Sequence, residues 1–426
     1  MSQKIAIVDC NNFYVSCERL FRPDLWNKPV AVLSNNDGCI VSRSQEVKDL
    51  GIKMAVPVHQ VKDLIRQHKI ELFSSNYPLY ADLSARIMES LEEFSPSVEV
   101  YSIDEAFIDL NQQNINPTAL GLEIKSKIWQ WVGIPVGVGI GPTKTLAKLA
   151  NYAAKKWPKT GGVVDISELS KRKKIMQITP VAEVWGVGRR LTEKLNSLGI
   201  ETVWDLQSQP IAAIHKNFNI TFAQTVQELK GMPVITLAAS DQAKQQIICS
   251  RSFKKKLKSQ RELAQCLSVF CLRVAEKLRY QKGFAGKVTV KIRTSPFKKG
   301  NAFYSNSAQQ NLTIPTDDSR ILLAITKQLL STIYKPGFLY QKATIILADI
   351  QSLPTAASHL QADLFSTSII KPETDLMDAL DKINQRFNKS ISFGATGNKT
   401  LRQSIPMNES KHYTTDWKGL VNVRIQ

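Results

Sequence analysis

The sequence predicts a multidomain α+β protein, and three observations support this fold class. The chain has 426 residues, which is more than a single hydrophobic core usually organises. Hydrophobic residues make up 43% of it, so the chain is globular. Strand and helix patterns alternate over about the first 165 residues, and the segments that follow differ from them in both pattern and charge.

Residues 1–165 carry the clearest periodic pattern. The β-branched run at 4–9 predicts a buried strand. The short helix predicted at 44–50 is stopped by Gly51, and a longer helix is predicted at 80–94 from apolar residues on one face. We also expect strands at 29–33, 40–42 and 134–140, two strands within 98–110, and helices at 119–132 and 143–155.

The remainder of the chain divides into four further segments. Residues 166–235 predict several short helices, and residues 236–247 are polar and typical of a linker. Residues 248–350 mix helical and strand patterns, which predicts a second, smaller α+β domain. The hydrophobic pattern weakens over residues 351–426, so this segment is predicted to be a tail.

The net charge of +19 is concentrated in the middle of the chain. Residues 1–150 hold 15 Lys and Arg against 17 Asp and Glu, whereas residues 151–300 hold 28 against 10. Residues 301–426 hold 13 against 10. A basic segment attached to a nearly neutral one is typical of proteins that bind nucleic acid. General solubility would not require this segregation.

Several classes of protein are excluded by composition. No run of apolar residues approaches 18, so we expect no membrane span, and the N-terminus lacks the regions of a signal peptide. The six cysteines form no CxxC pair, and the five histidines do not cluster near them. We therefore expect reduced thiols in a cytoplasmic protein rather than a disulfide framework or a zinc site.

Three carboxylates at the ends of apolar runs are the strongest chemical signal. Asp9 closes the run at 5–8, and Asp104 and Glu105 interrupt the stretch at 98–110. Buried carboxylates need a partner, and oxygen ligands suit Mg²⁺. Adjacent strand residues point to opposite faces, so Asp104 and Glu105 can converge only at a hairpin tip or bulge. Such a site could hold two Mg²⁺ ions for phosphoryl transfer, although a solvated turn is the simpler explanation of this pair alone.

Two glycine-rich segments could bind phosphate. The first, from Gly137 to Lys148, joins a strand end to a helix start, and Lys144 in the first turn could reach a triphosphate. It is not a Walker A loop, because its lysine does not directly follow a glycine. The second segment resembles a helix-hairpin-helix motif that would contact the DNA backbone through Gly186, Gly188, Arg189, Arg190 and Lys194.

Two further motifs lie downstream. Residues 251–300 hold 15 basic and 2 acidic residues, a density that suits contact with a phosphate backbone, and the densest part contains Arg251, Lys254, Lys255 and Lys256. In the tail, the pentapeptide at 361–365 contains Gln361, Leu364 and Phe365. An isolated pentapeptide of this kind is usually without function.

Taken together, these motifs resemble the Y-family (translesion) DNA polymerases, and within them the UmuC-type catalytic subunits of bacterial DNA polymerase V. The resemblance covers essentially the whole chain. It rests on Asp9 to Glu18, Phe21-Arg-Pro-Asp-Leu-Trp26, Ser34-Asn-Asn-Asp-Gly-Cys-Ile40, Ser102-Ile-Asp-Glu105 and Gly141-Pro-Thr-Lys-Thr145.

The resemblance implies a right-hand polymerase fold. It divides the chain into a palm (1–20 and 76–165), small fingers (21–75), a helical thumb (166–235), a linker (236–247), a little finger (248–350) and a C-terminal tail (351–426). The tail pentapeptide resembles a peptide that binds the sliding clamp.

The resemblance also implies residue roles. Asp9, Asp104 and Glu105 would hold two Mg²⁺ ions with the Cys10 carbonyl, and Tyr14, beside Phe13, would be the steric gate against a ribose 2′-OH. Lys144 would contact the triphosphate. In the fingers, Gln45 and Lys48, with Arg43 nearby, replace the usual Tyr and Arg; a lysine supplies charge but no bidentate fork.

The implied activity is low-fidelity, template-directed transfer of dNMP from a dNTP to a primer 3′-OH, in response to DNA damage. The implied partners are primer–template DNA, a processed UmuD dimer, a RecA filament and the replication clamp. Three alternatives stay open at this point: a two-metal nuclease, a non-catalytic DNA-binding module, and an enzyme of the polymerase IV branch.

Overall fold

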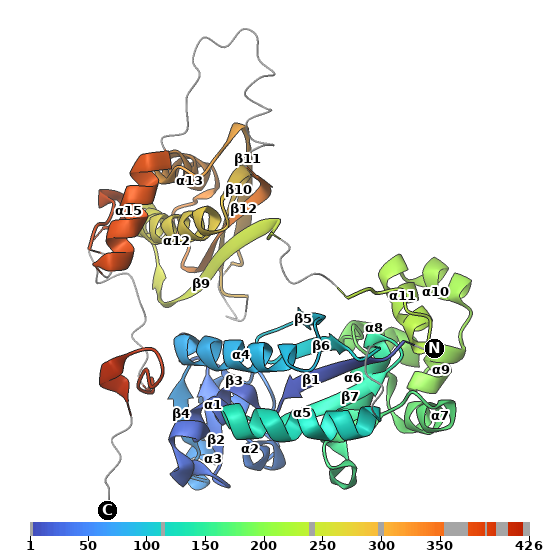
Figure 1. The fold of residues 1–426 in the computed structure, drawn as a ribbon. Helices are drawn as coiled ribbons and strands as arrows, with labels where there is room; N and C mark the ends of the chain where they lie inside the picture. The colour runs from blue at the N-terminus through green and yellow to red at the C-terminus, as the bar shows by residue number, and fades with distance from the viewer. Residues whose placement is uncertain are drawn as a thin grey trace, which may run out of the picture. The chain divides into compact units, whose positions relative to one another are not determined.

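The computed structural model describes residues 3–111, 116–237, 243–296, 302–352, 374–387, 390–397 and 408–420, without the side chains of residues 254, 374 and 418. The chain forms two compact units (Figure 1). Unit 1 comprises Met1–Asp241 and Pro406–Gln426, and unit 2 comprises Gln242–Ile405. None of the described helices is both long and apolar enough to cross a membrane.

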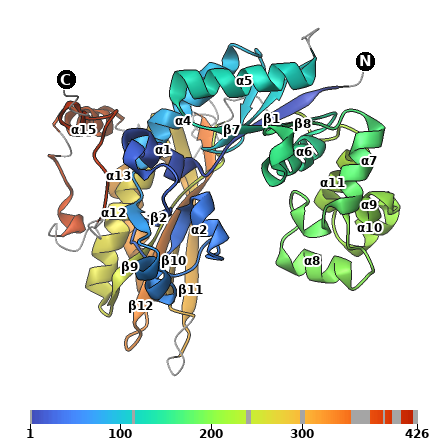
Figure 2. The ribbon, with the colours of Figure 1, turned by 90° about the horizontal axis from the view of Figure 1, so that it is seen from below.

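The central sheet of unit 1 has the order β5-β6-β1-β7-β8. Neighbouring strands are antiparallel except for β7 and β8. Helices α4 and α5 pack on one face of this sheet, and α6 packs on the other (Figure 2). The bounds are β1 (Ile5–Cys10), β5 (Val98–Val100), β6 (Glu105–Asp109), β7 (Val136–Gly141), β8 (Val163–Asp165), α4 (Tyr77–Glu92), α5 (Pro117–Val132) and α6 (Lys144–Lys156).

The period of two along β1 decides where its last carboxylate points. Ala6 and Val8 belong to the core on the α4 and α5 side, whereas Ile5 and Ile7 pack with Ala147 of α6. Asp9 has the same phase as Ile5 and Ile7, so its side chain lies on the α6 side.

A smaller sheet in unit 1 has the order β3-β2-β4, in which β4 is parallel to β2. Its bounds are β2 (Val30–Leu33), β3 (Ile40–Arg43) and β4 (Glu71–Ser74), with helices α1 (Phe13–Phe21), α2 (Gln45–Asp49) and α3 (Lys62–Gln67). We did not predict α1, α3 or β4. Helix α1 starts directly after Asn12, which adopts a left-handed conformation with φ 50° between β1 and the helix.

Five short helices complete the N-terminal part of unit 1, as the sequence predicted for residues 166–235. They share a core that contains Met176, Leu195, Leu206 and Phe222. The bounds are α7 (Leu169–Ile178), α8 (Arg189–Asn196), α9 (Val203–Ser208), α10 (Ile211–Asn217) and α11 (Ile220–Leu229).

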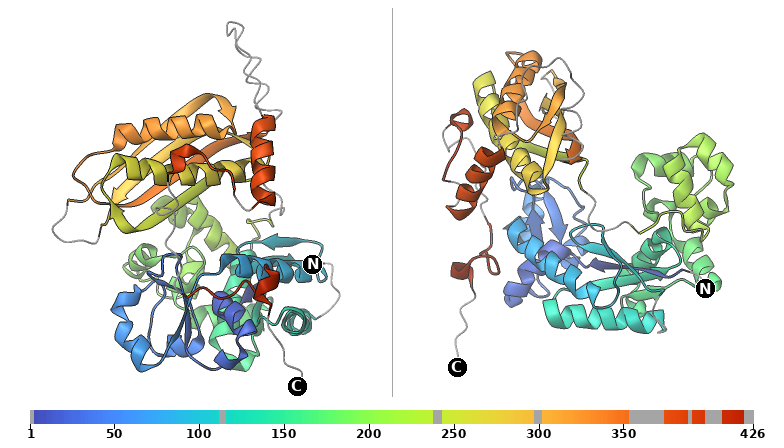
Figure 3. Two further views of the ribbon diagram at one scale, coloured as in Figure 1. Left: turned by 90° about the vertical axis from the view of Figure 1, so that its left-hand side faces the viewer. Right: turned by 45° about the horizontal axis from the view of Figure 1, so that its top comes forward.

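Unit 2 contains an antiparallel sheet of order β11-β10-β12-β9. Helices α12 and α13 lie side by side and pack on one face of this sheet (Figure 3). The sequence predicted strands at 287–293 and 343–349, which are longer in the structure, and a helix at 261–278; β9, β11 and α13 were not predicted. The bounds are β9 (Gln246–Leu257), β10 (Gly283–Thr294), β11 (Ser305–Thr316), β12 (Tyr340–Ser352), α12 (Gln260–Tyr280) and α13 (Ser319–Ile333). The mixed α+β fold class is confirmed.

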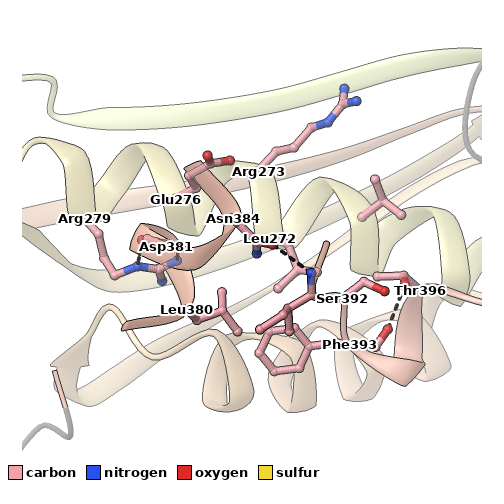
Figure 4. Close-up of a pocket in the computed structure, with 12 residues that line it drawn as sticks. Leu272, Arg273, Glu276, Arg279, Leu380, Asp381, Asn384, Ser392, Phe393 and Thr396 are labelled. Carbon is pink, nitrogen blue, oxygen red and sulfur yellow. Dashed lines mark hydrogen bonds and ion pairs between the residues drawn. The ribbon is translucent and has the colours of Figure 1, made fainter. Parts of the chain in front are cut away.

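The segment predicted as a tail contains ordered structure in both units. Helix α15 (Thr374–Arg386) is held on α12 of unit 2 by Arg279, whose Nε and Nη2 atoms donate to Asp381 at 2.6 and 2.9 Å (Figure 4). Residues 408–420 belong instead to unit 1. The proposed clamp-binding residues Gln361, Leu364 and Phe365 lie outside the described residues.

Candidate active site

The three predicted carboxylates lie at one end of neighbouring strands β1 and β6. Asp9 pairs with Glu105 in the antiparallel register, so their Cβ atoms are about 5 Å apart. Asp104 precedes β6, and its carbonyl accepts a 2.8 Å hydrogen bond from the Cys10 amide. Strands β5 and β6 form a hairpin, in which the Tyr101 and Ser102 amides donate to the Glu105 carbonyl. The predicted hairpin tip is therefore confirmed.

Helix α6 presents a row of cations and one amide to these carboxylates. Lys155 Nζ lies 2.5 Å from Asp9 Oδ1, and Asn151 donates to Asp9 Oδ2 at 3.0 Å. Lys148 Nζ contacts both oxygens of Glu105, at 3.0 and 2.9 Å. Residues 148, 151 and 155 share one helical face. Sequence reasoning missed all three, although this spacing, in a helix following a strand, was a usable signal.

Burial and, to a smaller extent, repulsion from the carboxylates raise the pKa values of Glu105 and Cys10. Burial is the main cause of the raised pKa of Glu105, and the charges of Asp9 and Asp104 add to it. Burial also raises the pKa of the Cys10 thiol, and the same three carboxylates add to that shift. The site therefore holds concentrated negative charge.

This donor set fits a divalent cation. Carboxylate oxygens are the ligands that Mg²⁺ prefers, and lysine ammonium groups now neutralise two of the three carboxylates. Among the residues that the structure describes, no group of three His, Cys, Asp or Glu side chains is already arranged around a common metal position. Asp104 instead accepts a hydrogen bond from the Ser102 hydroxyl at 2.6 Å.

The glycine-rich segment that forms β7 and leads into α6 does not form the predicted anion site. A Cβ on Gly139 would lie 2.2 Å from the Asn151 amide nitrogen, so this glycine allows α6 to pack closely on the sheet. At the start of α6, the Thr145 amide is already bonded to the buried Glu228 carboxylate at 3.0 Å. This helix N-terminus is therefore occupied by a carboxylate of the protein itself.

The prediction for Lys144 is corrected for the same reason. Its side chain is buried, and its ammonium group contacts Glu99 and donates to the Thr236 carbonyl. Lys144 thus holds two segments of unit 1 together, and it is Lys155, three turns along α6, that lies beside Asp9.

Cations of the small sheet and α2 stand near the carboxylates. Burial and the charges of Arg43 and Lys155 lower the pKa of Lys48, and Asp9 partly opposes this shift, so these groups lie close together. The Nε and Nη1 atoms of Arg43 are buried, and among the described residues neither has a hydrogen-bond partner. Buried donors without acceptors are costly, which favours an anion at this position.

Tyr14 stands at the start of α1, next to the carboxylates. Its ring stacks on Tyr80 with centroids 4.5 Å apart and an interplanar angle of 16°. Burial is the main cause that raises the pKa of Tyr14 to about 12, and Asp104 contributes. Phe13, predicted beside it as a substrate contact, is only 3% exposed and belongs to the hydrophobic core.

The predicted helix-hairpin-helix lies before and within α8. Gly186 has φ 88°, Gly188 is the N-cap of α8, and the side chains of Arg189 and Arg190 are exposed. Lys194 is engaged elsewhere, because it donates to the Asn217 carbonyl at 2.7 Å.

Trp185 of the same turn packs edge-on against Tyr101, with centroids 5.5 Å apart. Lys148 lies over both rings, at 4.5 Å from Tyr101 and 5.2 Å from Trp185. This aromatic support for an active-site cation was not predicted.

The basic residues of unit 2 occupy both faces of its sheet. Arg251 pairs with the buried Ala343, which places it on the helix-covered face with Cys249. On the opposite face, Lys291, Arg293, Lys342 and Thr344 line a hollow. Burial and the charges of Arg293 and Lys291 lower the pKa of Lys342. The sequence did not predict this cationic hollow. Of the residues that it did predict, Lys255 and Lys256 lie on β9, and the side chain of Lys254 is not described.

Comparison with known proteins assigns the chain to a family. Residues 8–152 match the impB/mucB/samB family, residues 244–364 match the C-terminal domain of that family, and residues 374–423 match a domain of unknown function (DUF4113). The chain is 43% identical to the protein ImpB of Salmonella typhimurium, over 99% of both chains. It is 42% identical to the protein UmuC of Salmonella typhimurium strain LT2, over 98% of this chain and 100% of that one.

One more distant relative and one solved structure are also similar to the chain. DNA polymerase IV of Caulobacter vibrioides is 26% identical over 90% of this chain and 91% of that protein. A Y-family DNA polymerase chimera, Dbh-Dpo4-Dbh, has the same fold with a TM-score of 0.69 at 20% identity, over 82% of this chain and 99% of that chain. The chain therefore belongs to the impB/mucB/samB family of Y-family DNA polymerases, which carry out error-prone translesion DNA synthesis.

Proposed function

We propose that Asp9, Asp104 and Glu105 are the catalytic carboxylates, and that they bind two Mg²⁺ ions together with the Cys10 carbonyl. The fold of this family implies the use of a divalent metal ion. The observation that carries the proposal is the meeting of three carboxylates at one end of β1 and β6, with lysines as their only cationic partners among the described residues. When bound, the metal ions supply charge stabilisation for in-line phosphoryl displacement.

The residues of the chain then bind and orient the nucleotide. Arg43, Lys48 and Lys155 form the triphosphate site, which is supported by their mutual proximity and by the unpartnered nitrogen atoms of Arg43. Lys155 exchanges its contact with Asp9 for a phosphate oxygen when metal ions and nucleotide bind. Lys148, held by Tyr101 and Trp185, adds positive charge beside Glu105. Catalysis is then positioning together with electrostatic stabilisation.

Tyr14 selects the sugar. Its ring stands beside the carboxylates and rests on the fully buried Tyr80, so it can exclude a ribose 2′-OH by steric contact. A rigid aromatic ring suits this role because it has few rotatable bonds and a fixed shape.

Duplex DNA is held by backbone contacts. Gly186, Gly188, Arg189 and Arg190 of the turn before α8 contact phosphates through amides and exposed guanidinium groups. In unit 2, Lys291, Arg293 and Lys342 bind the phosphate backbone, since the repulsion among them is relieved by a polyanion.

The chain acts in the cytoplasm as the catalytic subunit of a polymerase V complex in the SOS response. It associates with a processed UmuD dimer and a RecA filament, and it contacts the sliding clamp through Gln361, Leu364 and Phe365. The full-length identity of 42–43% to UmuC and ImpB supports the polymerase V branch over the polymerase IV branch, because the identity to DNA polymerase IV of Caulobacter vibrioides is lower, at 26%.

Primer extension tests the assignment of the carboxylates. The full chain, with processed UmuD and RecA, is incubated with a labelled primer–template, dNTPs and Mg²⁺. Asp104→Ala is expected to abolish extension while DNA affinity stays unchanged, because a metal ligand is lost and the DNA contacts lie elsewhere. Asp82→Ala, a carboxylate on the outer side of α4, is the control that keeps activity.

Two results would contradict the proposal. Retained extension by Asp104→Ala would remove this residue from the metal site. Shortening of the primer by the wild-type chain would indicate a two-metal nuclease instead.

A further inference from the structure

Residues 408–420, which we call the C-terminal strap, pack along an edge of unit 1. They lie within the match to the domain of unknown function. The strap pairs in parallel with the edge strand β4: the Ser74 amide donates to the Asn408 carbonyl at 2.9 Å, and the Asn408 amide donates to Ser74 Oγ at 3.0 Å. This pairing satisfies backbone groups that an edge strand otherwise leaves open.

Two side chains of unit 1 hold the strap in place. Asn76 Nδ2 donates to Ser410 Oγ at 2.9 Å and to the Lys411 carbonyl at 3.2 Å, while Asn76 Oδ1 caps the start of α4. The ring of Tyr413 stacks on Phe21 at the end of α1, with centroids 4.6 Å apart and planes at 9°. The strap therefore contacts both helices that carry the sugar-gate region.

A buried chain of contacts leads from the strap to Tyr14. Asn76, which binds the strap, lies one turn before Tyr80 in α4, and the Tyr80 amide donates to the Asn76 carbonyl at 3.1 Å. Glu18 on α1 is fully buried, and its Oε2 atom has no hydrogen-bond partner among the described residues. Tyr80 donates its hydroxyl to Glu18 Oε1 at 2.5 Å. The ring of Tyr80 in turn stacks on the ring of Tyr14.

We infer that the C-terminal strap is a positioning element for sugar selection, acting through Asn76 and Tyr80 of the first turns of α4 on the ring of Tyr14. The inference rests on the proposed role of Tyr14 as the gate. Ser410 and Tyr413 are positioning residues, because neither touches the carboxylates or the nucleotide site.

The physical reason is that a steric gate works only while its ring resists displacement. Tyr80 supports the ring of Tyr14 from behind, and its hydroxyl is fixed by a buried carboxylate. Without the strap, Asn76 at the start of α4 loses its hydrogen bonds to Ser410 and Lys411, so the first turns of α4 and with them Tyr80 gain freedom. The gate then gives way to a 2′-OH, while binding of a deoxynucleotide, which does not press on the ring, is unaffected.

The test measures kcat/KM for a dNTP and for the rNTP of the same base with the full chain. Ser410→Ala and Tyr413→Ala are expected to lower the dNTP-over-rNTP ratio about fivefold, the equivalent of one hydrogen bond, with dNTP insertion nearly unchanged. Ser410→Thr keeps the hydroxyl and should restore the ratio. Thr415→Ala, at an exposed position of the same strap, is the matched control.

Amide hydrogen exchange gives a second readout that does not depend on turnover. Ser410→Ala should raise exchange in peptides covering residues 12–22 and 76–82, and Thr415→Ala should not. If both strap variants leave the sugar ratio and the exchange unchanged, the inference is overturned.

The Tyr14→Ala variant distinguishes a failure of the gate assignment from a failure of the strap inference. If Tyr14→Ala relaxes sugar selection and the strap variants do not, only the strap inference fails. If Tyr14→Ala leaves sugar selection unchanged, the gate assignment fails, and the strap inference fails with it.

Discussion

At the scale of single residues, the site is organised by charges that compensate one another. Asp9 and Glu105 each form an ion pair with a lysine of α6. The nearby cations Arg43 and Lys48 form no ion pair with a carboxylate among the described residues. This arrangement supports the proposal that positive and negative groups exchange partners when a nucleotide with its metal ions binds. Glu18, by contrast, is a buried carboxylate that forms no ion pair with any residue the structure describes.

The titration of Glu18 yields a prediction about stability. Burial is the main cause that raises the pKa of Glu18 from 4.5 to about 7. The charge of Glu409 adds to this rise in the pKa, and Tyr80 and Ser410 oppose it. Between these two pH values the folded chain holds a proton that the unfolded chain releases, so the free energy of unfolding falls as the pH rises through this window. Glu18→Gln removes that loss. The change in the free energy of unfolding caused by Glu18→Gln should therefore be about 3 kcal/mol more favourable at pH 8 than at pH 4.5.

Urea unfolding of the wild type and of Glu18→Gln at both pH values checks this prediction. Glu92→Gln, an exposed carboxylate on α4, is the control and should change stability equally at both. An equal effect of Glu18→Gln at the two pH values would mean that Glu18 titrates normally.

At the scale of elements, the close approach of α6 to the sheet positions the cations of the site. A helix that presents Lys148, Asn151 and Lys155 to β1 and β6 must lie near the strands, and Gly139 in β7 permits this. The glycines of this segment therefore serve packing, whereas the sequence suggested phosphate binding.

Gly139→Ala should consequently destabilise unit 1. The new methyl carbon would lie 2.2 Å from the Asn151 amide nitrogen and 2.3 Å from the Ala147 carbonyl oxygen, so α6 would have to move. We expect a loss of about 3 kcal/mol in the free energy of unfolding, measured by urea titration. Gly188→Ala, which meets no atom within 4 Å and has φ −92°, should cost far less and serves as the control. Equal losses would refute the packing role.

At the scale of the whole molecule, charge is divided between functions. The acidic cluster that would bind metal ions lies in unit 1, and a cationic hollow lies in unit 2 on the sheet face opposite to α12 and α13. The charge segregation of the sequence thus agrees with the proposal of separate binding tasks, one for metal ions and one for the DNA backbone.

Lys291→Gln tests the second task. Removing one cation from the hollow should weaken primer–template binding equally for different sequences and reduce the slope of log affinity against log salt by about 1. Fluorescence anisotropy at several salt concentrations measures both quantities. Lys327→Gln, an exposed lysine on α13, should leave the slope unchanged. A sequence-dependent loss would indicate contact with bases instead.

The sequence by itself determined the α+β class, most elements of unit 1 and the three carboxylates. These follow from local signals: apolar periodicity defines strands and helices, and a carboxylate at the end of a buried strand is unusual wherever it occurs. Elements with weaker local patterns, such as α1, β11 and α13, were not predicted.

Only the tertiary structure decided which cations serve the site. The sequence favoured Lys144 for the triphosphate, but Lys144 is buried against Glu99. Arg251, predicted to contact DNA, has an exposed side chain on the helix-covered face of its sheet. Lys155, the hollow of unit 2 and the C-terminal strap depend on pairings between residues far apart in the chain. The physical reason is that burial and neighbouring charges decide what a charged side chain binds. Those neighbours come from distant parts of the sequence, so a local pattern cannot predict them.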